Sequence, residues 1–296
     1  MPAVSLAAVP TKRQRSIDLI AQFEERGFSG IYCPSFGDPI ALCQAIAERT
    51  NEIRFGTSIL PIYFRQPNDL AAAASFLHEL SGGRFDLGLG VSHGPTHSRL
   101  GITVGKPLAD TRDYVQALRD AEKMAGPLPP IVLATLRDKM VQLSVEISEG
   151  AVWANASRSR MAHSISLMAD VHTEFFVGNM IPTVISDDRE AAAAVNRKTL
   201  SGYVALPNYR NYWKSAGYVE EMEACETAIA NGNREALATA MSDSWLSDAT
   251  LYGTASEVRD GVEAWFDAGV TTPIIVPSAT DGGQLRAVEL LFEAYS

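Results

Sequence analysis

Short apolar runs alternate with longer amphipathic segments along the whole chain, and this alternation limits the possible fold more than any other feature. Strands this apolar are typical of parallel sheets covered on both faces, in which a helical crossover joins each strand to the next. The runs of strand type are Val4–Val9, Gly30–Cys33, Arg54–Leu60, Phe85–Val91, Pro130–Thr135, Ala151–Asn155, Glu174–Ile185 and Thr272–Pro277. The segments with helical periodicity are Arg13–Arg26, Pro39–Arg49, Asn68–Leu80, Leu108–Met124, Lys139–Ser148, Arg158–Val171, Arg189–Tyr203 and Leu285–Tyr295.

Eight βα units predict one α/β domain over residues 1–296, a (β/α)8 TIM barrel. The alternative, a doubly wound open sheet, usually has fewer strands. The connection before the last strand is far longer than a crossover helix needs, so we expect an inserted aromatic and helical segment at about residues 203–250. Its aromatic side chains fit either a helical hairpin packed outside the barrel or an aromatic wall over the barrel's C-terminal mouth. These side chains are Tyr203, Tyr209, Tyr212, Trp213 and Tyr218.

Composition excludes several classes of function. The 25 Lys and Arg residues against 35 Asp and Glu residues give a net charge of −10, so the chain lacks the positive field that attracts nucleic acid or anionic lipid. Its 3 cysteines show no CxxC spacing, which argues against a disulfide framework and against a zinc site. No run reaches the ~18 apolar residues of a membrane span, and the N-terminal apolar run is too short for a signal peptide. We expect a cytoplasmic protein with a small-molecule substrate.

The segment Gly88–Gly94, at the end of strand four, is the most suggestive part of the chain for chemistry. It fails as a dinucleotide loop, because His93 occupies the third glycine position of GxGxxG. It matches the GxSxG elbow of a serine hydrolase, with Ser92 as the nucleophile, but the sequence predicts a polar loop where the elbow needs a helix, and the last histidine, His172, comes before the late position that this enzyme class uses. In a third reading, the small residues let the backbone approach a flat ligand and present His93 to it, at the mouth where barrel enzymes keep their chemistry.

His93 and His97 have HxxxH spacing, which raises the question of a metal site. Gly94 and Pro95 predict that no helix brings the two rings to one face, so we expect no metal there. We predict that His93 is the catalytic residue that protonates or orients the substrate, and that His97 matters much less. The alternative for His93 is a loop histidine that only hydrogen-bonds a backbone carbonyl.

Two longer motifs resemble the luciferase-like monooxygenase family. One is RFGTSILPIYFRQP, from Arg54 to Pro67, and the other is LSGGRFDLGLGV, from Leu80 to Val91, and the two keep their relative spacing. Shorter matches extend the resemblance over nearly the whole chain. They lie at Gly27-Phe28, Val141–Gly150 and residues 253–270.

Within this family, Ser92-His93 and Leu206–Arg210 are most similar to the branch that uses the deazaflavin coenzyme F420. The resemblance implies a TIM barrel, often a homodimer, that binds FMN or F420 at its C-terminal mouth. It therefore implies an oxidoreductase that transfers a hydride between coenzyme F420 and an unknown small organic substrate. An FMN-dependent monooxygenase served by a partner reductase is the alternative. A serine hydrolase using Ser92 and a non-catalytic ligand-binding barrel are lesser ones.

The resemblance also implies a cofactor site built from three strand ends. A cis peptide bond between Ser58 and Ile59 would lie in a bulge of strand three that supports the cofactor ring. The residues after strand four would line the other side of the ring, and those after strand five, with the following helix amides, would hold the phosphate. The implied cofactor-binding residues are Ser58, Ile59, Gly90, Val91, Ser92, His93, Thr135, Leu136 and Arg137.

This sequence departs from the family pattern at two places. Many relatives have an acidic residue and a histidine at the end of strand two, where this chain has Ser35 and Phe36. Many also have Gly-Pro where this chain has Arg137 and Asp138, and an aspartate beside a phosphate repels it unless the side chain points away or caps the helix. These positions are therefore the weakest part of the implied site.

Overall fold

The computed structural model describes residues 1–168, 171 and 173–296, so that Ala169, Asp170 and His172 lie outside the described residues. The predicted helix Arg158–Val171 reaches into this gap. The chain divides into two compact units. Unit 1 comprises residues 1–153 and 167–178, and unit 2 comprises residues 154–166 and 179–296. The single domain that the sequence predicts stays a prediction.

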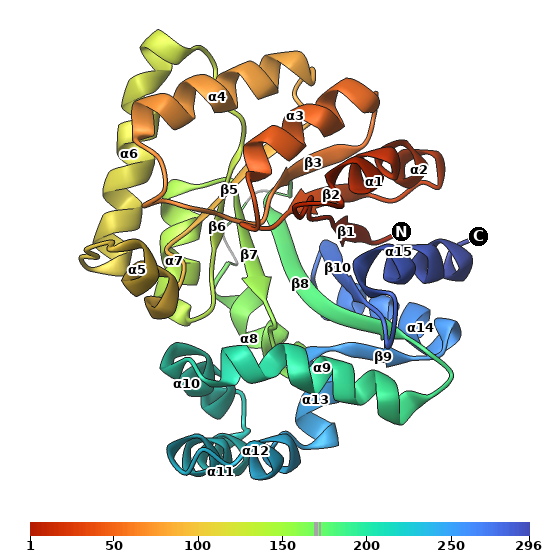
Figure 1. Cartoon of the computed structure of the whole chain (residues 1–296). Helices are drawn as coiled ribbons and strands as arrows, with labels where there is room; N and C mark the ends of the chain where they lie inside the picture. The colour runs from red at the N-terminus through yellow and green to blue at the C-terminus, as the bar shows by residue number, and fades with distance from the viewer. Residues whose placement is uncertain (169–170, 172) are drawn as a thin grey trace. The chain divides into compact units, whose positions relative to one another are not determined.

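Unit 1 is built on a parallel sheet whose strands follow chain order (Figure 1). β1 pairs with β2, β2 with β3, β3 and β4 with β5, β5 with β6, and β6 with β7, all in parallel. This confirms the parallel strands that the apolar runs predict. The strands are β1 (Ala3–Ser5), β2 (Gly30–Cys33), β3 (Arg54–Thr57), β4 (Leu60–Pro61), β5 (Phe85–Gly90), β6 (Ile131–Ala134) and β7 (Gly150–Ala154, whose last residue belongs to unit 2).

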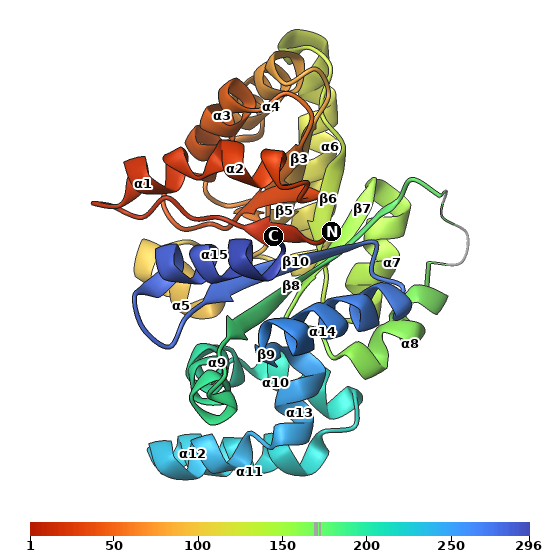
Figure 2. The ribbon, with the colours of Figure 1, turned by 90° about the vertical axis from the view of Figure 1, so that its right-hand side faces the viewer.

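Helices of unit 1 cover the strands, and α3, α4 and α6 lie next to one another as one layer (Figure 2). Proline stands in the first turn of each of these three helices, where its missing N–H has no intrahelical role. At α3 the Asp38 carboxylate also caps the helix by accepting from the Ile40 amide at 3.1 Å. The helices are α1 (Arg13–Asp18), α2 (Ile20–Glu25), α3 (Pro39–Arg49), α4 (Pro67–Leu80), α5 (Gly94–Leu100), α6 (Pro107–Ala125) and α7 (Asp138–Ile147).

Unit 2 contains three strands and the C-terminal helices. Its longest strand, β8, begins in unit 1 at Phe176 and pairs with both β9 and β10. In Figure 2, α11 and α12 pack against each other. The elements are β8 (Phe176–Ile185), β9 (Leu251–Gly253), β10 (Thr272–Ser278), the 3-10 turn Arg158–Arg160, α8 (Met161–Ser166), α9 (Arg189–Val204), α10 (Pro207–Ser215), α11 (Val219–Ala230), α12 (Arg234–Ala240), α13 (Asp243–Ala249), α14 (Ala255–Asp267) and α15 (Gly283–Ala294).

The predicted insertion is helical, and its aromatic side chains form part of the core of unit 2. Tyr209, Tyr212, Trp213 and Trp245 are all buried. Trp213 packs edge-on against Trp245, with ring centroids 4.9 Å apart, and its indole N–H donates to the Asn155 carbonyl at 3.2 Å. Burial of these rings favours core packing over an exposed aromatic wall, because a wall that binds ligand presents its ring faces to solvent.

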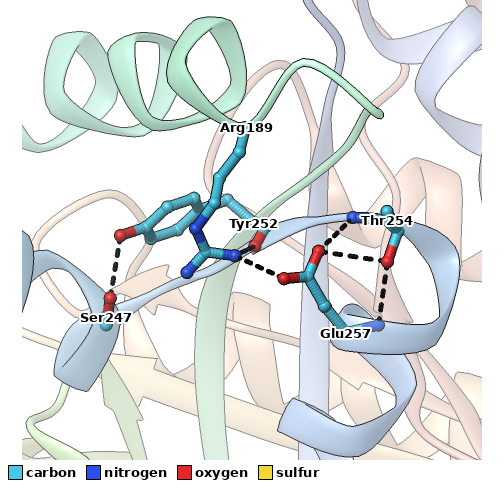
Figure 3. Close-up of polar contacts among 5 residues, drawn as sticks. All are labelled: Arg189, Ser247, Tyr252, Thr254 and Glu257. Atoms are coloured by element: carbon cyan, nitrogen blue, oxygen red, sulfur yellow. Dashed lines mark hydrogen bonds and ion pairs between the residues drawn. The ribbon is translucent and has the colours of Figure 1, made fainter.

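One polar cluster of unit 2 caps a helix (Figure 3). The Arg189 guanidinium lies over the Tyr252 ring at 4.6 Å and donates to Glu257 at 2.9 Å. Glu257 in turn closes a capping box with Thr254 at the start of α14. All of these polar groups have partners, so the cluster holds β9 and the ends of α9 and α14 together.

Candidate functional site at the carboxyl ends of β3, β5 and β6

Three neighbouring strands of unit 1 end beside the residues that the sequence predicts for the cofactor. Ser58 and Ile59 follow β3, Gly90–His93 end and follow β5, and Thr135–Arg137 follow β6. Because β3 pairs with β5 and β5 pairs with β6, all in parallel, the three segments lie at one edge of the sheet. Parallel α/β proteins place their ligand sites at this carboxyl edge.

The predicted strand-three bulge is present. The peptide bond between Ser58 and Ile59 is cis, as the resemblance implies, and it separates β3 from the two-residue β4. The Ser58 amide donates to the Cys33 carbonyl at 2.8 Å, and the Thr57 hydroxyl donates to the Gly88 carbonyl at 2.7 Å. These bonds tie the bulge to β2 and β5, so its backbone position is fixed from both sides.

Glycine is required beside the bulge, because there is no space for a side chain. A Cβ atom on Gly88 would lie 1.9 Å from the Thr57 carbonyl oxygen, and a Cβ atom on Gly90 would lie 2.7 Å from the Ala134 Cβ and 2.9 Å from the Ile59 Cδ1. Gly88 and Gly90 therefore allow β5 to pack closely against its neighbours. Gly94 differs, since no atom lies within 4 Å of a Cβ built there.

The segment after β5 is a tight turn into a helix, which corrects the loop predicted from Pro95 to Pro107. α5 occupies Gly94–Leu100, with His93 as its N-cap residue. Proline is tolerated there because the first turn of a helix leaves its N–H groups without intrahelical partners. Ser92 has a φ of 61°, in the left-handed region that few non-glycine residues adopt. The prediction that Gly94 and Pro95 prevent a helix was thus wrong, but His93 stays outside α5 with an extended backbone, so the helix does not contain both histidines.

The two histidines of this turn have different surroundings. The His97 Nε2 lies 2.6 Å from the Val91 carbonyl oxygen, and its ring packs edge-on against Tyr63 with centroids 5.3 Å apart. Burial, together with repulsion from His97, lowers the pKa of His93 below its ordinary value of 6.5. His93 is therefore mostly neutral at pH 7 and has a lone pair with which to accept a proton.

The segment Thr135–Arg137, after β6, combines a buried hydroxyl with an exposed cation. Thr135 is buried, and Arg137 is exposed as the N-cap residue of α7. No side chain caps this helix. The Met140 amide already donates to the Arg137 carbonyl at 2.8 Å, so an anion would bind at the amides before it. Asp138 is the first residue of α7, and its carboxylate would repel a phosphate bound at the start of this helix.

Two buried hydroxyls of the site have no hydrogen-bond partner among the described residues, namely Ser58 Oγ and Thr135 Oγ1. Buried polar atoms in folded proteins are nearly always paired. The two atoms lie after β3 and β6, on either side of β5. They are therefore candidates for contact with a bound ligand.

Sequence reasoning missed a charged network below the bulge, in which Tyr32 and Asp86 are buried and Arg54 is half exposed. The Tyr32 hydroxyl donates to Asp86 at 3.2 Å, and Arg54 forms an ion pair with the same carboxylate. Burial is the main influence on Asp86 and raises the pKa of its carboxyl, although Arg54 opposes the effect. Tyr32, Asp86 and Ser58 line one narrow internal space. The signal in the sequence is an aspartate inside the apolar run Phe85–Gly90.

A cavity of about 210 Å³ lies beside the bulge, at the ends of β2 and β4. Ser35, one of the two departures from the family pattern, lines it together with Leu60, Phe64 and the ion pair between Arg65 and Asp38. Phe36, the other departure, is 68% exposed. The walls of the cavity are polar and apolar in about equal measure.

The Leu206–Arg210 segment, which carries part of the F420 resemblance, opens α10 in unit 2. Arg210 donates to the Val204 carbonyl at 2.6 Å and to Glu226 at 3.1 Å. Its guanidinium therefore joins helices of unit 2. Within the described part of the chain, no group of three or more His, Cys, Asp or Glu residues is arranged to hold a metal ion, and no helix there is long and apolar enough to cross a membrane.

Comparison with known proteins identifies the family. The profile described as luciferase-like monooxygenase matches residues 4–272. The chain belongs to this family. A putative coenzyme F420-dependent oxidoreductase of Mycobacterium tuberculosis is 27% identical to it, with 90% of this chain and 92% of the relative covered. The resemblance inferred from the motifs is thus confirmed, and so is the prediction that the protein is an enzyme.

Solved structures show the same fold. The coenzyme F420-dependent tetrahydromethanopterin reductase of Methanopyrus kandleri superposes with a TM-score of 0.77 at 16% identity, covering 98% of this chain and 97% of that one. A Baeyer-Villiger monooxygenase component of Pseudomonas putida, in complex with FMN, has a TM-score of 0.61 at 15% identity, covering 98% and 97%. The fold of this luciferase-like protein is the α/β TIM barrel that the eight βα units predict.

Proposed function

We propose that this luciferase-like protein is an oxidoreductase that transfers a hydride between coenzyme F420 and a small organic substrate at the carboxyl edge of unit 1. The observation that carries the proposal is the convergence of Ser58-Ile59, Gly90–His93 and Thr135–Arg137 on three paired strand ends. The F420-dependent activity named for the Mycobacterium relative supports the choice of cofactor. When bound, the deazaflavin would supply the ring carbon that carries the hydride. The reduced deazaflavin reacts poorly with oxygen.

The residues present fit such a group. The unpartnered hydroxyls of Ser58 and Thr135 offer hydrogen bonds to polar edges of a ring or its side chain. Arg137 and the uncapped amides of α7 offer a positive site for a phosphate, although the chain as a whole carries a net charge of −10. Affinity for an anionic cofactor must therefore come from these local contacts, because long-range attraction is absent.

His93 is the proposed catalytic residue. Its lowered pKa leaves the imidazole neutral at pH 7, so it can accept a proton from an alcohol group whose carbon gives up a hydride. In the reverse direction the imidazolium returns that proton to a carbonyl oxygen. We assign the cavity beside the bulge to part of the substrate, since its volume of about 210 Å³ suits only a compact molecule or fragment.

Titration of the purified protein with both cofactors tests the proposal. Coenzyme F420 should bind at least about tenfold tighter than FMN, a difference of ~1.4 kcal/mol, as followed by ring fluorescence. Tighter binding of FMN, with oxygen consumed when a reductase supplies the reduced flavin, would make the protein a monooxygenase. The likeness to the FMN-bound Baeyer-Villiger enzyme makes this the second candidate.

Substitutions at two neighbouring residues test the phosphate site, because they should change the affinity for F420 in opposite directions. Arg137→Ala should weaken F420 binding by about tenfold, and by more at low salt than at high salt, because ion pairs to phosphate are screened. Asp138→Asn should tighten binding by a few fold, since it removes a repelling charge from the first turn of α7. Arg137→Lys, which keeps the charge, serves as the control. A phosphate bound elsewhere would leave all three dissociation constants unchanged.

We further propose a cytoplasmic homodimer with a small-molecule substrate, without nucleic-acid or membrane partners. The acidic net charge supports the absence of nucleic acid. A partner reductase would be needed only by the FMN-dependent alternative.

A further inference from the structure

We infer that His97 is a positioning residue that holds the turn presenting Ser92 and His93 to the cofactor, and this inference rests on the proposed function. His97 closes the turn at two points. Its backbone amide donates to the His93 carbonyl at 3.1 Å, and its imidazole Nε2 lies 2.6 Å from the Val91 carbonyl. A carbonyl oxygen only accepts, so Nε2 carries the proton in this contact.

The contact with Val91 replaces a strand partner at the point where β5 stops pairing. The Gly90 carbonyl still accepts from the Ile62 amide at 2.9 Å, as part of the sheet. The next carbonyl, that of Val91, receives the His97 imidazole instead. Ser92 then adopts its left-handed φ of 61°. The imidazole thus satisfies the carbonyl of the residue directly before the strained one.

A second contact fixes the His97 ring itself. Tyr63 packs edge-on against the ring, and its hydroxyl donates to Asp110 at 2.6 Å. Burial and the Asp110 carboxylate raise the pKa of Tyr63, so the hydroxyl keeps its proton. Asp110 also accepts from the Gly105 amide at 2.8 Å. Tyr63 lies in the loop between β4 and α4, and Asp110 lies in the first turn of α6. The two residues therefore connect His97 to both of these segments.

A single side chain can have this effect because α5 is not anchored by buried side chains. None of the residues of α5 is buried, so the helix contributes no core packing of its own. The contacts of His97 with the Val91 and His93 carbonyls therefore help to set the position of α5 and of the backbone at its His93 N-cap. A displacement of about 1 Å at a reacting group lowers rates by up to 10²-fold.

Hydrogen–deuterium exchange and turnover measurements on His97 variants test this role. His97→Ala should speed amide exchange in residues 91–100 by roughly tenfold or more and lower turnover by roughly tenfold, while unfolding midpoints stay near the wild-type value. His97→Gln should restore both, since its amide N–H reaches the same carbonyl. Ser98→Ala, an exposed position on the same helix, is the control and should change neither.

The outcomes separate this inference from the proposed function. If wild-type protein binds F420 but His97→Ala exchanges and turns over like wild type, only the role of His97 is overturned. The same holds if His97→Gln behaves like His97→Ala, because the effect is then loss of the ring and not of the hydrogen bond. Wild-type protein that binds neither F420 nor FMN would overturn the proposed function, and the assignment of His97 with it.

Discussion

Replacement of His93 by alanine is expected to lower turnover by roughly 10²–10⁴-fold, because the imidazole transfers a proton to or from the substrate. Cofactor affinity should stay within a few fold, since most of the predicted cofactor contacts come from other residues. Turnover is measured from the change in F420 absorbance with the best substrate found in a screen of small alcohols and carbonyl compounds. His93→Gln keeps a hydrogen-bonding group but transfers no proton near neutral pH, and it should be about as slow. Wild-type turnover in both variants would make His93 a structural loop residue.

The rate of the same reaction should change with pH in opposite directions for oxidation and for reduction. The pKa of His93 lies below 6.5, and the neutral form is the one that accepts a proton. Alcohol oxidation should therefore be level above the pKa of His93 and fall as the pH drops through it. Carbonyl reduction, which needs the imidazolium, should fall as the pH rises through the same pKa. His93→Gln should lack both limbs, so a limb that persists in this variant belongs to another group.

Gly88→Ala should be the most damaging single-methyl substitution at the site. The added Cβ would lie 1.9 Å from the Thr57 carbonyl oxygen, which is backbone held inside the sheet. Overpacking a core usually costs about 1–3 kcal/mol, and a clash with fixed backbone belongs at or above the top of that range. We expect a marked fall in the free energy of unfolding, measured by urea denaturation, or failure to fold.

Gly94→Ala is the control for this substitution. It lies six residues further along the same motif, at the start of α5, and its added methyl group meets no atom within 4 Å. Its free energy of unfolding should stay within about 0.5 kcal/mol of the wild-type value. Equal stability of the two variants would show that β3 and β5 separate easily, contrary to the packing described.

Local pattern predicted most of the strands and helices and the family, but it missed β9 and α14, which follow the predicted insertion. β2 coincides with the predicted run Gly30–Cys33, and β5 falls short of the predicted run by one residue. Such runs are readable because burial on both faces demands a continuous apolar stretch whatever its neighbours are. The spacing of the two motifs indicated the family, and through it the cis bond between Ser58 and Ile59. The proximity of the three cofactor segments followed from parallel strand order.

The tertiary structure decided the features that depend on which residues meet across the fold. Gly94 and Pro95 suggested a loop, yet α5 begins there because a first turn tolerates proline. The partner of His97 is a carbonyl six residues earlier, reached only because the chain turns at Ser92. Asp86 meets Arg54 and Tyr32 from two other strands. The periodicity of apolar residues indicates which side chains are buried. It does not indicate which residue each of them contacts, because strand register and turn geometry determine those contacts.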